Sequence, residues 1–99
     1  MTMFYKMFPC RVRTTNGKDI LFTGSLLAEA VIDRHNEKQR LALYRTKSGH
    51  FVAETLTWAK RLGTMGKCEG KVCMNAEEVR AFLGHQSEAV EMYKKVGFL

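Results

Sequence analysis

Residues 40–58 read RLALYRTKSGHFVAETLTW, and this stretch decides the fold of the chain. Its two halves are rich in Leu, Tyr, Thr, Phe and Val, which are typical of β-strands because they suit a pleated, half-buried surface. Ser48 and Gly49 separate the two halves, and glycine can adopt the positive φ of a tight turn. The stretch therefore predicts a β-hairpin at the centre of an antiparallel sheet.

A second hairpin is predicted before the first. Residues 10–15 read CRVRTT and residues 18–22 read KDILF, with Asn16 and Gly17 between them. Asn-Gly is the strongest short-range signal for a two-residue type I′ turn, so the two runs are expected to pair directly. This register places Val12, Leu21, Cys10 and Thr23 on one face of the hairpin, and Arg11, Arg13, Ile20 and Phe22 on the other.

Residues 25–33, SLLAEAVID, agree with two local structures. A helix capped by Ser25 would gather the apolar residues at positions 26, 27, 30 and 31, whereas a strand would align those at positions 26, 28, 30 and 32. We predict a strand, with a bulge or bend at Gly24, because the polar run of residues 34–39 then becomes the turn that leads into the central hairpin.

The region after Trp58 changes character. Residues 59–71 read AKRLGTMGKCEGK, with three glycines and five charged residues. Such a stretch is too interrupted for a long regular element, so residues 59–74 are predicted to form a basic loop, with room for a short edge strand near residues 68–74.

Two helices are predicted to follow. Asn75 and Glu78 have the spacing of a capping box, so a helix is expected over residues 75–83, with Gly84 at its end. A second helix over residues 87–96 would begin at a Ser87 cap and stop at Gly97. Phe98 and Leu99 are then expected to return to the core.

These elements predict one α+β domain over residues 1–99: an antiparallel meander of four or five strands over residues 10–58, with the two helices of residues 75–97 packed on one face. The chain has 99 residues, 45% of them hydrophobic, which suits a single core. The apolar arm of residues 1–9 needs cover, and docking on its own sheet and forming a homodimer interface are equally open alternatives.

Charge and cysteine content narrow the function classes. The formal net charge is +6; residues 76–99 carry three basic and four acidic side chains, net −1, so residues 1–75 carry +7. Clustered cations favour a polyanionic partner. No run reaches the roughly 18 apolar residues of a membrane span, and three cysteines without a Cys-x-x-Cys spacing indicate reduced thiols, so we expect a cytoplasmic protein without a membrane partner.

Three segments of the chain also resemble a family of small uncharacterised bacterial proteins, commonly accessory-gene products of the mobile-element type. The segments are GSLLAE at residues 24–29, LYRTKSG at residues 43–49 and FLG at residues 82–84. The resemblance covers about residues 22–97 and implies no known activity, cofactor or catalytic residue. It implies a strand over residues 25–33 and an accessory origin.

Motifs that would signal catalysis or metal binding are incomplete. Residues 63–67 resemble part of a phosphate-binding loop, but Arg61 and Cys68 replace the glycine and the hydroxyl residue that such a loop requires. Cys68 and Cys73 have no matching second pair of zinc ligands. No nucleophile, base and orienting group share a recognisable spacing. We therefore predict a non-enzymatic protein without a metal or cofactor.

The sequence instead points to binding of nucleic acid or of an acidic protein, and two sets of cations could carry it. The loop cations surround Trp58, which could stack on a base; the sheet cations share the strands with aromatic residues. Each set has a structural alternative: Trp58 as a core residue, which we favour, and an ion pair between Arg45 and Glu54, which are diagonal when Arg45 faces Val52. The loop cations are Lys60, Arg61, Lys67 and Lys71, and the sheet cations are Arg11, Arg13 and Arg45.

Overall fold

The computed structural model describes residues 6–61 and 64–99. In this part of the chain five strands form one antiparallel sheet whose spatial order follows the sequence. The predicted α+β fold, with a meander followed by two helices packed on it, is confirmed. The elements are β1 (Phe8–Val12), β2 (Ile20–Asp33), β3 (Glu37–Thr46), β4 (Phe51–Ala59), β5 (Thr64–Cys73), α1 (Ala76–Leu83) and α2 (Ser87–Val96).

The ambiguous residues 25–33 are part of strand β2, as predicted. Ala28 and Ile32 are buried beneath the helices, whereas Glu29 and Val31 on the other face are exposed. The bulge lies at residue 27, between the pairs Leu26–Tyr44 and Ala28–Leu43, and not at Gly24 as expected. At Gly24 the chain instead approaches the Arg45 carbonyl so closely that a Cβ atom would not fit.

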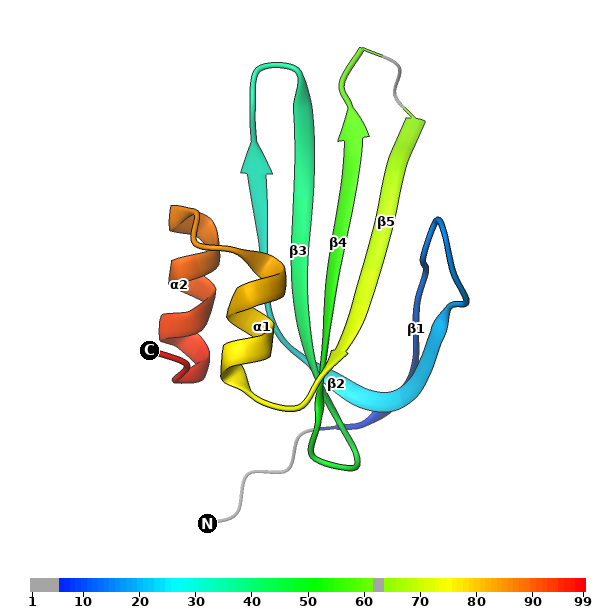
Figure 1. Ribbon diagram of the computed structural model, residues 1–99, viewed down its shortest axis with the longest axis vertical. Coiled ribbons are helices and arrows are strands. Elements are labelled where there is room, and N and C mark those ends of the chain that lie inside the picture. The colour runs from blue at the N-terminus through cyan, green and yellow to red at the C-terminus, as the bar shows by residue number, and fades with distance from the viewer. Residues whose placement is uncertain (1–5, 62–63) are drawn as a thin grey trace.

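Strand β2 is long and strongly curved, and this curvature gives the molecule its second layer. Figure 1 shows β2 sweeping beneath the sheet, so that β1 comes to lie beside β5, although the two strands are opposite edges of the sheet. The helices α1 and α2 cover the other side. The β1–β2 hairpin therefore closes over part of the face that the helices leave open.

The main core lies between the sheet and the helices. Tyr93 of α2 is its largest fully buried side chain, and its hydroxyl donates to the Gly84 carbonyl at 2.6 Å. Phe51 and Phe98 meet edge to face with ring centroids 5.1 Å apart, which confirms that Phe98 returns to the core, whereas Leu99 is 71% exposed and does not. The buried members are Ala28, Ile32, Leu41, Leu43, Ala53, Cys73, Val79, Leu83, Ala89, Met92 and Tyr93.

The helix boundaries are set by caps. Asn75 Oδ1 accepts from the Glu78 amide at 2.9 Å, which is one half of the predicted capping box, whereas Glu78 Oε2 accepts from the Met74 amide at 2.8 Å and not from that of Asn75. Gly84 follows the helix with a φ of 90°. Gly97 adopts the left-handed conformation that ends α2, with a φ of 77°. The predicted Ser87 cap is wrong: Ser87 is the first helical residue, and Gln86 precedes it without a side-chain cap.

Both hairpins have a register one residue away from the predicted one. Arg45 pairs with Phe51 and not with Val52, because the β3–β4 loop uses three residues, with Gly49 at a φ of 90°. Val12 pairs with Ile20 and not with Leu21, because Gly17 has no positive φ and residues 13–19 form a longer loop. A shift of one residue moves side chains to the opposite face, so Phe22 and Ile20 share a face with Val12 and not with Arg11.

The basic loop predicted over residues 59–74 is largely wrong, because Thr64–Cys73 is a ten-residue strand, with one register shift opposite Thr57 and Trp58. The edge strand foreseen near residues 68–74 is present and begins earlier. Its glycines are compatible with this because they lie at close approaches: a Cβ atom on Gly66 would be 3.1 Å from the Thr57 carbonyl oxygen.

The thiols differ in accessibility, which gives a first prediction. Cys73 is fully buried, and burial raises the pKa of its thiol. Because the thiolate is the reactive form, Cys73 should react with a thiol reagent about tenfold or more slowly than the half-buried Cys10 and Cys68 at a pH of about 8. Titration with Ellman's reagent should therefore detect two thiols in the folded protein and the third after denaturation. Equal rates for all three would contradict the placement of Cys73.

Candidate binding groove along strand β5

Strand β5 has one edge paired with β4 and one edge that is mostly open. On the open edge the Cys68 amide donates to Thr15 Oγ1 at 2.7 Å, and the Cys68 carbonyl accepts from the Thr15 amide at 2.8 Å. Because the peptide groups of every second residue in a strand point the same way, those of Gly70 and Val72 also face this edge. No hydrogen bond joins them to another residue in the described part of the chain.

The β1–β2 hairpin is held against β5 by an apolar contact at Gly70. Val12 is fully buried, and a Cβ atom on Gly70 would lie 2.5 Å from Val12 Cγ1 and 3.1 Å from Ile20 Cδ1. Gly70 is thus the position where the absence of a side chain lets the hairpin approach. The Thr15–Cys68 hydrogen bonds and this contact fix the hairpin beside the strand.

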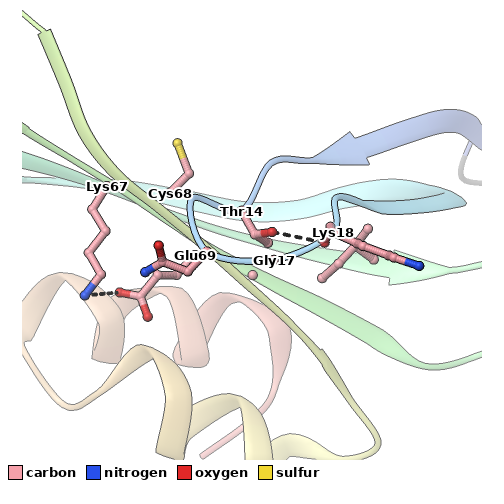
Figure 2. A pocket seen from close by; sticks show the side chains of 9 residues that line it. Thr14, Gly17, Lys18, Lys67, Cys68 and Glu69 are labelled. Atoms are coloured by element: carbon pink, nitrogen blue, oxygen red, sulfur yellow. Dashed lines mark hydrogen bonds and ion pairs between the residues drawn. The ribbon is translucent and has the colours of Figure 1, made fainter.

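Two hollows remain on either side of this contact. The first has a volume of about 370 Å³ and lies between the β1–β2 loop and residues 67–70 of β5 (Figure 2). The second has a volume of about 400 Å³ and lies between residues 20–23 of β2, the β3–β4 loop and Val72. Phe22 and Val52 also line the second hollow, so it is mainly apolar. We call the two hollows together with the open edge of β5 the β5 groove.

The rim of the β5 groove is basic. Its lining includes Lys18 and Lys67 at the first hollow and Lys47 at the second, against one carboxylate, Glu69. Lys67 and Glu69 form an ion pair at 3.4 Å, and Figure 2 shows the Lys18 side chain pointing away from this pair. Lys71 of β5 is exposed and forms no ion pair with any described residue. An acidic ligand would therefore meet cations on both sides of the edge.

A half-buried polar cluster lies next to the groove, on the face of the sheet opposite to the helices. Glu54 is 6% exposed and pairs across β4 and β5 with Gly70. Its Oε1 atom accepts from Arg40 Nη1 at 3.0 Å and from the Tyr44 hydroxyl at 3.3 Å. Arg40 Nη2 also donates to Glu29 Oε2 at 2.6 Å, so the guanidinium bridges two carboxylates.

Burial and the neighbouring groups shift the pKa values of Tyr44 and Arg40 in this cluster. Burial raises the pKa of Tyr44, and the negative charge of Glu54 raises it further. Burial is the largest single influence on Arg40 and acts to lower its pKa, but the hydrogen bonds and electrostatic interactions with Glu29 and Tyr44 together outweigh burial and raise the pKa. Arg40 and Glu54 form an ion pair at 3.0 Å, and Tyr44, with its raised pKa, is a neutral donor to Glu54. Tyr44 in turn meets Phe22, which lines the second hollow, edge to face at 5.4 Å.

The structure does not bring the seven predicted binding residues together. Lys67 and Lys71 lie on β5, and Arg13 lies two residues before Thr15, so these three flank the groove. Arg45 of β3 pairs with Phe51 at the start of β4, whereas Lys60 follows the end of β4, so the two cations lie at opposite ends of the β3–β4 hairpin, roughly 30 Å apart at about 3.3 Å per residue.

Arg11 and Lys60 also form ion pairs with carboxylates of the chain. Arg11 Nε donates to Asp19 Oδ2 at 2.8 Å, and the Thr14 amide and Arg11 together lower the pKa of Asp19. Lys60 pairs with Asp33 and lowers the pKa of that carboxyl. Arg13, Arg45, Arg61 and Lys71 form no ion pair with the residues that the structure describes.

Two structural alternatives from the sequence can be judged directly. The ion pair between Arg45 and Glu54 is wrong, because the register places Arg45 on the helix side and Glu54 pairs with Arg40 instead. Trp58 shares a strand face with Leu56, as expected, but it is half-buried and not part of the buried core. Residues 62–63 of the proposed stacking loop and residues 1–5 of the apolar arm lie outside the described residues.

The groove could not be predicted from the sequence because two contacts between distant residues create it: the Thr15–Cys68 hydrogen bonds and the contact of Val12 with Gly70. The Thr15–Cys68 hydrogen bonds join residues 53 positions apart, and no local pattern signals them. The Arg40–Glu54 pair could have been found from the alternation of Arg40, Ala42 and Tyr44, but only with the correct register of the central hairpin.

Signs of catalytic or metal chemistry are few among the described residues. They contain no group of three or more His, Cys, Asp and Glu side chains placed to hold a metal ion. Ser48 Oγ and His50 Nδ1 lie 3.1 Å apart beside the second hollow, but Ser48 Oγ is also within 2.9 Å of Thr46 Oγ1, and in the described chain no carboxylate orients the imidazole. This pair is explained by the hydrogen bonds of the three-residue turn.

Neither the helices nor the comparisons with known proteins indicate the class of protein. No helix in the described chain has the length and apolar character needed to cross a membrane. The chain matches no protein-family model, no curated protein and no solved structure. What the groove binds is therefore inferred from its geometry and charge.

Proposed function

We propose that the protein is a non-enzymatic binding module that holds an acidic segment of a partner protein in the β5 groove. One observation carries the proposal: an open strand edge at Gly70 and Val72 lies directly beside an apolar hollow with a lysine rim. Open edges are rare liabilities that proteins usually blunt, and they are also a common site of peptide recognition.

A protein ligand fits this geometry better than the nucleic acid that the net charge of +6 also suggests. A nucleic-acid surface needs cations that follow a phosphate backbone and aromatic faces on which bases stack. Here Arg45 and Lys60 lie at opposite ends of the β3–β4 hairpin, and Arg11 and Lys60 are paired with carboxylates. Phe22 in the groove meets Tyr44 edge to face, so it presents no free stacking platform.

The homodimer expected from the apolar arm stays a prediction. Phe8 and Pro9 of the arm belong to β1 and pair with β2, but the Met7 and Phe8 side chains are 39% and 57% exposed, so they offer an apolar surface for self-association. Self-association through these residues would leave the β5 groove free.

The function is tested with two polyanions. Poly-L-glutamate and a single-stranded oligothymidylate are titrated into isotope-labelled protein, and amide shifts are followed by NMR. We expect poly-L-glutamate to bind more tightly, to perturb residues 67–72 and the β1–β2 loop, and to weaken by about tenfold or more between about 50 and 200 mM salt.

Matched variants locate the site. Lys18→Gln combined with Lys67→Gln should reduce poly-L-glutamate affinity about tenfold, whereas Lys94→Gln combined with Lys95→Gln should leave it nearly unchanged, because these exposed lysines lie on α2. The same charge is removed in both pairs. Tighter binding of the oligothymidylate, or equal effects of the two pairs, would overturn the proposal.

A further inference from the structure

The β5 groove has a shape that restricts how a ligand can lie in it. The open peptide groups of Gly70 and Val72 are spaced as in any strand, and β4 occupies the other side of β5. An extended peptide is the ligand that can satisfy a row of alternating donors and acceptors. From this, and resting on the function proposed above, we infer that the protein binds its partner by strand addition: an extended segment with alternating apolar and acidic residues pairs with β5 from Gly70 to Val72.

The alternation follows from the two faces of β5. Val72 pairs with Val52, and both line the second hollow, so side chains of an added strand on this face would enter an apolar space. Lys71 lies on the opposite face, where its register partner is Ala53. In a paired strand successive side chains point to opposite faces, so apolar residues on one face require acidic residues on the other.

The second hollow has room for the apolar side chains. Its volume of about 400 Å³ lies between Val72 on one wall and residues 20–23 of β2 on the other. The Thr23 carbonyl already accepts from the Lys47 amide at 2.7 Å, so β2 is fixed by the β3–β4 loop at this end. The walls are therefore set before a ligand arrives, which reduces the entropy lost on binding.

Charge argues against a second copy of the chain as the added strand. Two β5 strands that paired edge to edge from Gly70 to Val72 in antiparallel register would bring Lys71 of one chain opposite Lys71 of the other, and like charges opposite each other destabilise a sheet. The chain as a whole also carries +6. An acidic segment of another protein meets neither penalty.

The opposite end of the edge limits how far the added strand can extend. The hydrogen bonds between Cys68 and Thr15 occupy the edge there, and the β1–β2 loop lies across it. The added strand therefore begins at Gly70 and continues past Val72 toward Met74, whose side chain is 58% exposed.

The test uses two blocked dodecapeptides of equal composition. In the first peptide valine and glutamate alternate; in the second they are arranged in pairs, so the period of two is lost while charge and composition stay the same. We expect the alternating peptide to bind about tenfold more tightly, because only it can fill the hollow and face Lys71 at the same time.

A protein variant tests the hydrogen bonds. Val72→Pro removes an amide that faces the open edge and leaves the β4–β5 ladder intact, so the variant should fold but lose the preference for the alternating peptide. Val72→Thr keeps the amide and the branched shape and should retain the preference. Thermal unfolding of both variants shows whether they are folded.

N-methylated peptides test the same bonds without changing the protein. Methylation of every second amide of the alternating peptide should abolish binding in one parity and leave it nearly unchanged in the other, because only one set of amides faces β5. Equal effects of both parities, or equal affinities of the alternating and paired peptides, would overturn strand addition while binding of poly-L-glutamate upheld the acidic-partner function. If poly-L-glutamate, the alternating peptide and the paired peptide all failed to bind, both strand addition and the acidic-partner function would be overturned.

Discussion

Replacing Glu54 with alanine should lower the free energy of unfolding by about 3 kcal/mol. The Glu54 side chain is 8% exposed and the Arg40 side chain 27%, so removal of the carboxylate leaves a half-buried guanidinium with one partner fewer. The Tyr44 hydroxyl also loses its acceptor. Urea denaturation, with an unchanged dependence of the unfolding free energy on denaturant concentration, measures the loss.

Glu29 provides the control because it binds the same guanidinium from an exposed position. The Glu29 side chain is 53% exposed, so Glu29→Ala should cost less than about 1 kcal/mol, although its contact with Arg40 is shorter, at 2.6 Å. Replacing both members of the buried pair, as Arg40→Met with Glu54→Leu, should recover most of the stability. If Glu29→Ala and Glu54→Ala cost the same, burial does not govern the strength of the pair.

The elements that were predicted correctly have local signals in the sequence. Helix α1 was predicted correctly because its cap is local: Asn75 and Glu78 are three residues apart and bond directly. The strand over residues 25–33 was predicted from the apolar residues at positions 26, 28, 30 and 32 and from the polar run of residues 34–39 that follows as a turn, and it is part of β2. Signals of this kind depend only on neighbours in the sequence.

The registers were not predictable in the same way. Asn16-Gly17 suggests a two-residue turn, but Thr14 Oγ1 donates to the Lys18 carbonyl at 3.0 Å and Asp19 accepts from the Thr14 amide at 3.3 Å, and these bonds stabilise a longer loop. In both hairpins the longer loop shifted the paired residues by one and moved the charges to other faces. The predicted partner of Arg45 changed for this reason.

The candidate site depended even more on distant contacts. A basic loop was predicted around Lys67 and Lys71 because glycines interrupt the sequence there, but those glycines permit a strand that the β1–β2 hairpin can approach. The two lysines are therefore rim residues of a groove and not part of a flexible loop. Their charge was evident from the sequence, whereas the apolar hollow beside them required the curvature of β2.

The contact that forms this groove can be tested at Gly70. We expect Gly70→Ala to lower the free energy of unfolding by about 2 to 3 kcal/mol, because the added Cβ atom would lie 2.5 Å from Val12 Cγ1 in a fully packed position. Gly17→Ala is the matched control. Its Cβ atom would lie 3.4 Å from Thr14 Oγ1 and Gly17 has no positive φ, so it should change stability by less than about 0.5 kcal/mol.

A second substitution separates a clash with the hairpin from a general effect on the strand. Val12→Ala alone should lower the free energy of unfolding by about 2 kcal/mol through the cavity it leaves. In the Gly70→Ala background the same substitution also removes the clash. The double variant should therefore be more stable, by about 1 kcal/mol or more, than the sum of the two single effects predicts. Hydrogen exchange at the Cys68 amide, which donates to Thr15, should accelerate in Gly70→Ala and slow again in the double variant. Strict additivity, with no change at Cys68, would mean that Val12 does not rest on Gly70, and the hairpin would then not be the wall that closes the groove.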